Sequence, residues 1–144
     1  MIMDATTLFS NTQAVTATAV SANIVDLGAT GTVYGAAAAI VRDIGRGAAV
    51  PLKVTVVESF NNLTSLTISV ETDDNIGFAS AKTVWSSPTY ALTDLATGAK
   101  LLLPDSIPLG TDERYVRLRY TVAGTAPTLG KITAGVTAGN QTNG

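Results

Sequence analysis

The chain of 144 residues contains neither cysteine nor histidine. It therefore lacks the side chains of most nucleophile–base pairs and the ligands that transition metals prefer, so a metal could be held only through carboxylate oxygens. Disulfides are also excluded, and a single domain of this length buries roughly two thirds of the surface of its unfolded chain without them. These absences predict a protein that is not an enzyme and that carries no cofactor or metal.

Charged residues are scarce as well, at 14% of the chain against about 25% in typical soluble domains. The formal net charge is −2, so the chain offers no basic surface for nucleic acid. Ala, Thr, Ser and Asn must cover much of the surface instead, which a protein tolerates best where other subunits cover it. The composition thus favours a protein that works through contacts with its own copies or with other proteins.

Long apolar runs are missing too. The longest spans residues 35–41, well short of the ~20 residues that cross a bilayer. The opening residues, MIMD, lack the basic start of a secretory signal. We therefore expect neither a membrane partner nor export by that route.

What the chain does contain is a series of short segments with a period of two. Within residues 114–123, Leu118 and Tyr120 fall on one face while Arg117 and Arg119 fall on the other. This pattern predicts a strand with one buried and one wet face. Thr and Val are abundant elsewhere, and Gly, Asn, Asp and Pro divide the chain into similar short runs. The other seven predicted strands span residues 13–18, 21–27, 50–58, 64–72, 81–86, 99–104 and 131–138.

Eight strands with both long and tight connections favour an all-β fold, an eight-stranded antiparallel jelly-roll sandwich. An immunoglobulin-like sandwich competes with it, but no cysteines flank Trp85. The one helix candidate, residues 35–42, amounts to a turn or two. Residues 1–12 show no alternation and are predicted to be an extended N-terminal arm, followed by the jelly-roll domain over 13–138 and a flexible tail over 139–144.

Two groups of residues could form small-ligand sites, and each also has a structural explanation. Asp73, Asp74 and Asn75 could bind calcium, but their spacing is not that of a twelve-residue calcium loop, and turn chemistry after a strand explains them. Trp85 and Tyr90 could stack on a sugar ring, although a lone tryptophan on a strand more often belongs to the core.

Two groups of arginines could contact a partner. The segment RDIGRG at 42–47 could hold an anion or a carboxylate, or it could simply turn the chain into the next strand. Arg117 and Arg119 could bind an acidic patch of a partner. They could equally pair across the sheet with Glu71 or Asp73, which is worth less than about 1 kcal/mol at an exposed site.

Six local strings occur in order along the chain. They are SNTQAVTATA at 10–19, VDLG at 25–28, RDIGRG at 42–47, ETDDN at 71–75 with Phe78, ERYVRLRY at 113–120 and GKITAG at 130–135. In this order they resemble the capsid cement (decoration) proteins of tailed bacteriophages of the Bordetella phage type, over about residues 1–139.

The resemblance implies a jelly-roll protein without enzymatic activity, made in the cytoplasm of the bacterial host and seated on the outer capsid surface of the virion. It also implies a homodimer or homotrimer. The partner would be the major capsid protein lattice, whose subunits the protein would bridge to stabilise the shell. A carbohydrate-binding or host-attachment jelly-roll module on the virion, using Trp85 and Tyr90, is the alternative.

One segment departs from the family pattern. Relatives run almost directly from the 25–28 string to the 42–47 string, whereas residues 29–41 are inserted here. This inserted segment has no charge and would be a liability in a solvated loop, so we predict that it lies at a subunit interface. Residues 1–12 offer further apolar side chains that no internal pattern buries. The resulting candidate contacts with the capsid or with other subunits are Leu8, Phe9, Tyr34, Ile40, Arg42, Asp43, Arg46, Arg117 and Arg119.

Overall fold

The computed structural model describes residues 2–101 and 105–139, and regular structure in this part of the chain is almost entirely β. The strands are β1 (Met3–Ala14), β2 (Ala19–Val20), β3 (Val25–Asp26), β4 (Leu52–Glu58), β5 (Leu63–Asp73), β6 (Lys82–Ser86), β7 (Tyr90–Ala91), β8 (Tyr115–Gly124) and β9 (Lys131–Thr137). One turn of 3-10 helix, η1 (Leu92–Asp94), is the only helical element of the described residues. The prediction of an all-β protein with almost no helix is confirmed.

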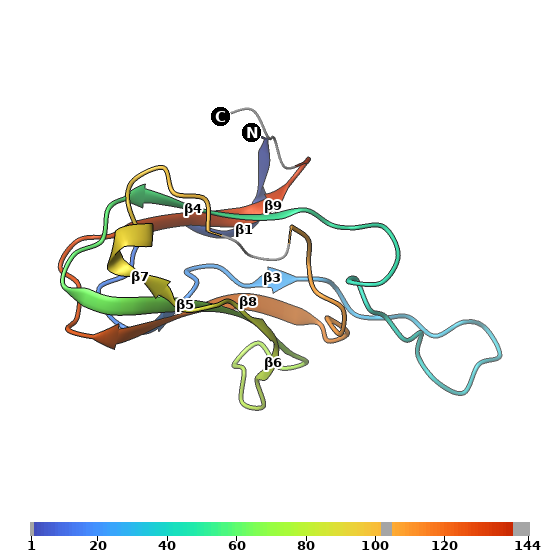
Figure 1. The fold of residues 1–144 in the computed structure, drawn as a ribbon. Helices are drawn as coiled ribbons and strands as arrows, with labels where there is room; N and C mark the ends of the chain where they lie inside the picture. The colour runs from blue at the N-terminus through green and yellow to red at the C-terminus, as the bar shows by residue number, and fades with distance from the viewer. Residues whose placement is uncertain (1, 102–104, 140–144) are drawn as a thin grey trace.

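The strands form two antiparallel sheets that lie on each other as layers (Figure 1). The smaller sheet has the order β1-β9-β4, and the larger has the order β2-β8-β5-β6, with β3 also on β8 and β7 also on β5. The predicted facing of the two longest neighbours in the larger sheet is confirmed, because Ile68 and Val70 lie opposite Tyr120 and Leu118 and all four are buried. Alternation therefore predicted the central pair of the sheet correctly.

The structure corrects the prediction of an extended N-terminal arm over residues 1–12. Residues 3–14 form β1, which pairs with β9 at the edge of the smaller sheet. Three register shifts between Met3 and Gln13 interrupt this pairing, and each shift changes which side chains face the core. The strand therefore lacks a regular alternation, which is why its sequence reads as an unpaired arm.

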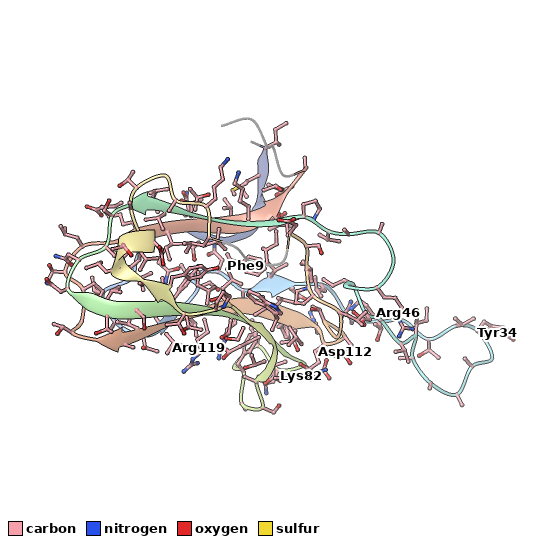
Figure 2. All side chains as sticks on the ribbon, viewed as in Figure 1. Phe9, Tyr34, Arg46, Lys82, Asp112 and Arg119 are labelled. Atoms are coloured by element: carbon pink, nitrogen blue, oxygen red, sulfur yellow. The ribbon has the colours of Figure 1, made fainter. Side chains whose placement is uncertain are left out.

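Phe9 is the clearest consequence of this correction. Its side chain is 1% exposed and lies between the two sheets (Figure 2), and its carbonyl oxygen accepts a hydrogen bond from the Asn23 amide at 2.9 Å. Leu8, its neighbour on β1, is half-buried. Phe9 is thus a core residue and offers no exposed surface to a partner.

Two buried side chains tie the sheets together by hydrogen bonds. Ser10 on β1 and the Tyr120 hydroxyl on β8 are 2.7 Å apart, and Ser10 Oγ donates its proton to Gln13 Oε1 at 2.7 Å. Since serine has one hydroxyl proton, Tyr120 must be the donor to Ser10. Burial raises the pKa of Tyr120, so this hydroxyl keeps its proton.

Several predicted strands are wrong or shorter than expected. Of the predicted strand at 13–18, only residues 13 and 14 are in a strand, because β1 ends at Ala14. Near the predicted strand at 21–27, only the short β2 and β3 pair with β8. In residues 99–101, Lys100 makes a single isolated bridge to β4, and 102–104 lie outside the described residues, as do 140–144 of the predicted tail. Runs of Thr, Ala and Val suit a strand anywhere, but a strand forms only where a neighbour supplies the hydrogen-bonding edge.

Candidate functional site

Residues 29–41 form a loop that projects from one end of the sandwich after β3 (Figure 1). Every residue of this 29–41 loop is exposed, and it contains no charged side chain. Tyr34 is fully exposed at the outer tip (Figure 2), and Val33 and Val41 are 58% and 91% exposed. The predicted helical turn at 35–42 does not form. An apolar, uncharged projection of this kind is unusual for a free soluble surface and points to an interaction.

Backbone contacts draw the two arms of the 29–41 loop together. Thr32 and Ala39 form an antiparallel bridge, and the Ile40 amide donates to the Gly31 carbonyl oxygen at 2.9 Å. The loop therefore has the form of a narrow hairpin, and its tip is held at a distance from the sandwich. An ordered projection loses less conformational entropy on binding than a free coil does.

Arg42 closes the base of the 29–41 loop. Its Nη1 donates to the carbonyl oxygens of Leu27 at 2.9 Å and Gly28 at 2.8 Å, and its Nη2 donates to that of Glu113 at 3.4 Å. These bonds join the chain entering the loop to the chain leaving it. The predicted contact residue Arg42 therefore holds the base of the loop together through bonds within its own chain.

Asp26, the last residue of β3, anchors the entry to the loop. Arg114 Nε and Nη2 each donate to one of its carboxylate oxygens at 2.8 Å, and the Gly28 amide donates to Oδ1 at 2.8 Å. The Arg114 hydrogen bonds, and then that of Gly28, lower the pKa of Asp26 to about 2. The carboxylate is therefore charged, and the anchor formed, at every pH above the acid range.

A cleft of about 510 Å³ lies where the 29–41 loop meets the sandwich. One wall of this base cleft comes from the two ends of the loop, and the other comes from Asp74, the start of β6 and residues 112–114. Its lining residues are Gly28, Ala29, Thr30, Ile40, Val41, Arg42, Asp74, Lys82, Asp112, Glu113 and Arg114. Three of these side chains are cationic and three are carboxylates, so the cleft is polar but balanced in charge.

The outer wall of the base cleft carries an ion pair. Lys82 Nζ lies 2.9 Å from Asp112 Oδ1, with side chains that are 45% and 44% exposed. Their hydrogen bond raises the pKa of Lys82 and lowers that of Asp112, so both are charged at neutral pH. Figure 2 shows the pair at the end of the sandwich from which the loop departs, well away from Tyr34. An exposed pair of this kind contributes little to stability.

The sequence model of the Bbp16 family matches residues 9–136 of this chain. The chain belongs to the Bbp16 family. This is a family of Bordetella phage proteins, so the predicted resemblance is confirmed, and membership indicates a phage virion protein. No curated protein matches the chain. The Bbp16 match includes the whole 29–41 loop and every residue of the base cleft. Among the described residues, no helix has the length and apolar character needed to span a bilayer.

The 42–47 segment of this Bbp16 chain mostly serves the fold. The Asp43 carboxylate accepts hydrogen bonds from the amides of Gly45 and Gly110, both at 3.0 Å, which fixes the segment against a second loop. A Cβ at Gly45 would lie 2.1 Å from the Pro108 carbonyl oxygen, so this close approach requires glycine. Asp43 is thus a structural residue, whereas Arg46 is exposed beside the base of the loop (Figure 2).

Arg117 and Arg119 face one buried carboxylate. Arg117 Nε lies 2.7 Å from Glu71 Oε2, and Arg119 Nη1 lies 3.6 Å from Oε1. The Arg117 side chain is 14% exposed and its guanidinium stacks 4.0 Å from the centre of the Phe78 ring. The cross-strand explanation is therefore confirmed for Glu71. The assumption that Arg117 is exposed is wrong, and only Arg119, at 42% exposed, still presents charge to a partner.

The residues predicted as a possible sugar site and a possible calcium site have structural roles instead. Tyr90 is 8% exposed, and Trp85 is half-buried against the core, so they do not form an exposed pair of stacking rings. The Asp73 carboxylate accepts hydrogen bonds from the amides of Asn75 at 2.7 Å and Ser80 at 2.8 Å. Such bonds are typical of a turn after a strand. They agree with the prediction that turn chemistry, and not calcium binding, explains this group.

Sequence reasoning predicted Tyr34 and Ile40 as exposed interface candidates but missed the base cleft. Its charged residues come from four separate parts of the chain, at 42, 74, 82 and 112–114, and no spacing along the chain connects them. The only signal of the base cleft in the sequence is the cluster of charged residues at 112–114, in a chain that has few charged residues.

Proposed function

We propose that this protein is a capsid cement (decoration) protein, a non-enzymatic jelly roll that binds the outside of the assembled capsid and bridges major capsid subunits. The observation that carries the proposal is the 29–41 loop, an uncharged apolar hairpin that is entirely exposed in the isolated chain. Membership of the Bbp16 family, which indicates a phage virion protein, supports the proposal that a partner in the virion covers this loop. A protein that binds only the assembled shell stabilises that shell by mass action, and repetition over the lattice adds avidity.

The test is the addition of the purified protein to capsids of its phage that lack it, followed by cryo-electron microscopy and thermal disruption of the shells. We expect density on the outer surface that bridges neighbouring capsid subunits, and a higher disruption temperature. Tyr34→Asp should greatly reduce occupancy, because it introduces a charge at the tip of the 29–41 loop. Leu129→Asp, at a 51% exposed site in the turn between β8 and β9, is the matched control and should bind normally.

Density in the tail or neck of the virion, or no density at all, would overturn the capsid assignment. Equal loss of occupancy with Tyr34→Asp and Leu129→Asp would show that the 29–41 loop has no special part in attachment. The carbohydrate alternative relied on Trp85 and Tyr90 as an exposed pair, and it is not favoured because Tyr90 is 8% exposed.

A further inference from the structure

The outer face of the smaller sheet carries three of the four lysines of this chain. Lys53 alternates with core residues along β4, so its side chain lies on the face that turns away from the larger sheet. Thr55 follows two residues later on this face, and its isolated bridge to Lys100 puts the side chain of Lys100 beside it. Lys131 begins β9 and is paired with Glu58 of β4. Lys53, Lys100 and Lys131 define a lysine face that extends roughly 15 Å along β4.

Two of the lysines on this face have no carboxylate partner. Lys131 and Lys82, the lysine outside the face, each pair with a carboxylate, at 2.8 Å and 2.9 Å. By contrast, neither Lys53 nor Lys100 forms an ion pair with any residue that the structure describes. Lys100 is exposed and Lys53 is half-buried. The lysine face therefore presents two unpaired cations, although the chain as a whole has a net charge of −2.

The lysine face and the 29–41 loop point in different directions. Figure 1 shows β4 and β9 in the layer that forms one broad side of the sandwich, whereas the loop leaves from one end. A protein that bridges two capsid subunits needs two contact surfaces, and the loop offers one that is apolar and uncharged. The lysine face differs from it in both place and chemistry, because it suits a partner of opposite charge.

A protein surface with a few carboxylates fits the lysine face better than a nucleic acid or another polyanion does. A long polyanion needs a basic stripe, and its affinity grows with each phosphate that is neutralised. Here only two cations are unpaired, Glu58 lies in the same row, and the negative net charge of the chain disfavours a polyanion at long range. Single aspartates or glutamates of a partner can pair with Lys53 and Lys100 without bringing a long run of negative charge.

We propose that the lysine face docks onto an acidic patch of a capsid subunit, with Lys53 and Lys100 paired to its carboxylates. This inference rests on the proposed cement function, and it adds the second of the two contacts that bridging requires. The contact is electrostatic, so it sets how binding responds to salt. The 29–41 loop has no charge and supplies affinity that moderate salt affects little.

Reversal of both charges tests the sign of this interaction. Wild type and Lys53→Glu/Lys100→Glu are added to capsids that lack the protein, and dissociation constants are measured between about 50 and about 300 mM NaCl, a range over which salt screens exposed charges. At low salt the reversed variant should bind at least about tenfold more weakly than wild type, because like charges then face each other. Added salt should weaken the binding of wild type but strengthen that of the reversed variant, since it screens attraction in one and repulsion in the other.

A neutral variant and a charge-matched control separate this effect from net charge. Lys53→Gln/Lys100→Gln should bind roughly threefold to tenfold more weakly than wild type at low salt, with a flatter salt dependence. Thr121→Glu/Leu129→Glu changes the net charge by the same amount, at exposed sites in the larger sheet and in the turn after β8, and should bind as wild type does. A carbodiimide joins an amine to a carboxylate in contact with it, so it should link Lys53 or Lys100 to an acidic residue of a capsid subunit.

The remaining outcomes decide against the proposal. A reversed variant that binds as the control does, or whose binding salt weakens further, would show that the lysines only keep the sheet surface in water. Binding of wild type to double-stranded DNA that the reversed variant loses would assign the face to a polyanion instead. If Tyr34→Asp abolishes capsid occupancy while the reversed variant binds normally, the proposed function stands and this inference fails. If wild type does not bind capsids, both fail.

Discussion

At the scale of single residues, the two arginines that face the buried carboxylate of Glu71 should contribute differently to stability. Arg117 is nearly buried, bonds Glu71 at 2.7 Å and stacks on Phe78, whereas Arg119 lies farther away and is 42% exposed. Removing one partner of a buried ion pair leaves the other without compensation and commonly costs about 3–5 kcal/mol. We expect Arg117→Ala to lower the free energy of unfolding by about 2–4 kcal/mol, since Arg119 remains to compensate Glu71 in part.

Urea denaturation of the two variants measures this difference. Arg119→Ala is the matched control and should cost no more than about 1 kcal/mol, as for other exposed pairs. Equal losses for the two variants would contradict the unequal burial of the two arginines. Sequence reasoning, which places both on a wet face, predicts small losses for both.

Asp26 provides a residue-scale prediction about pH. Its pKa in the folded protein is about 2, below its ordinary value of 3.8, because Arg114 and the Gly28 amide bond the charged form. A carboxyl group with a lowered folded pKa stabilises the fold above its ordinary pKa, and this stabilisation is lost as the pH falls from about 4 to about 2. The anchor of the 29–41 loop should therefore loosen in that acid range.

Carbon-13 NMR titration of the carboxyl groups tests this prediction directly. Asp26 should titrate near 2 in the wild type, and Arg114→Gln should raise its pKa toward the ordinary value because the main hydrogen-bond donor is lost. An Asp26 signal that titrates normally in the wild type would show that the bidentate contact is absent in solution.

At the scale of elements, β1 makes the N-terminal residues part of the folded sandwich and not a separate arm. Phe9 fills the space between the sheets at 1% exposed, so Phe9→Ala should lower the free energy of unfolding by about 3–5 kcal/mol. Ile2→Ala, at a 75% exposed site just before the strand, is the control and should change it by no more than about 0.5 kcal/mol. Chemical denaturation provides the measurement. A Phe9→Ala protein as stable as the control would restore the interpretation of an unpaired arm.

The elements also show how far the sequence alone predicts this structure. Regular alternation predicted β4, β5, β8 and β9 and the burial of residues such as Ile68 and Leu118, because a half-buried strand alternates apolar and polar side chains along the chain. β1 was missed because bulges break its alternation. The 29–41 loop was found as an uncharged segment, but its hairpin form and the base cleft depend on backbone bonds and on turns far apart in sequence, which no local pattern contains.

At the scale of the whole molecule, we expect the stability of the sandwich to be independent of the proposed binding role of the 29–41 loop. The core lies between the sheets, whereas every residue of the 29–41 loop is in solvent and is fixed only at its base by Arg42 and Asp26. Loss of exposed residues that pack against nothing has little effect on folding. Changes in the loop should therefore alter assembly and leave the fold intact.

Shortening the 29–41 loop tests this separation in one variant. Thr32 and Ala39 are antiparallel partners, so residues 33–38 can be replaced by Asn-Gly, a dipeptide that closes a two-residue hairpin turn. The anchors at the base are kept. We expect the free energy of unfolding of the isolated protein to change by no more than about 1 kcal/mol, while its protection of capsids against heat falls to that of undecorated shells. A shortened protein that protects capsids as well as the parent would remove the 29–41 loop from the attachment surface, whereas one that fails to fold would show that the loop supports the sandwich itself.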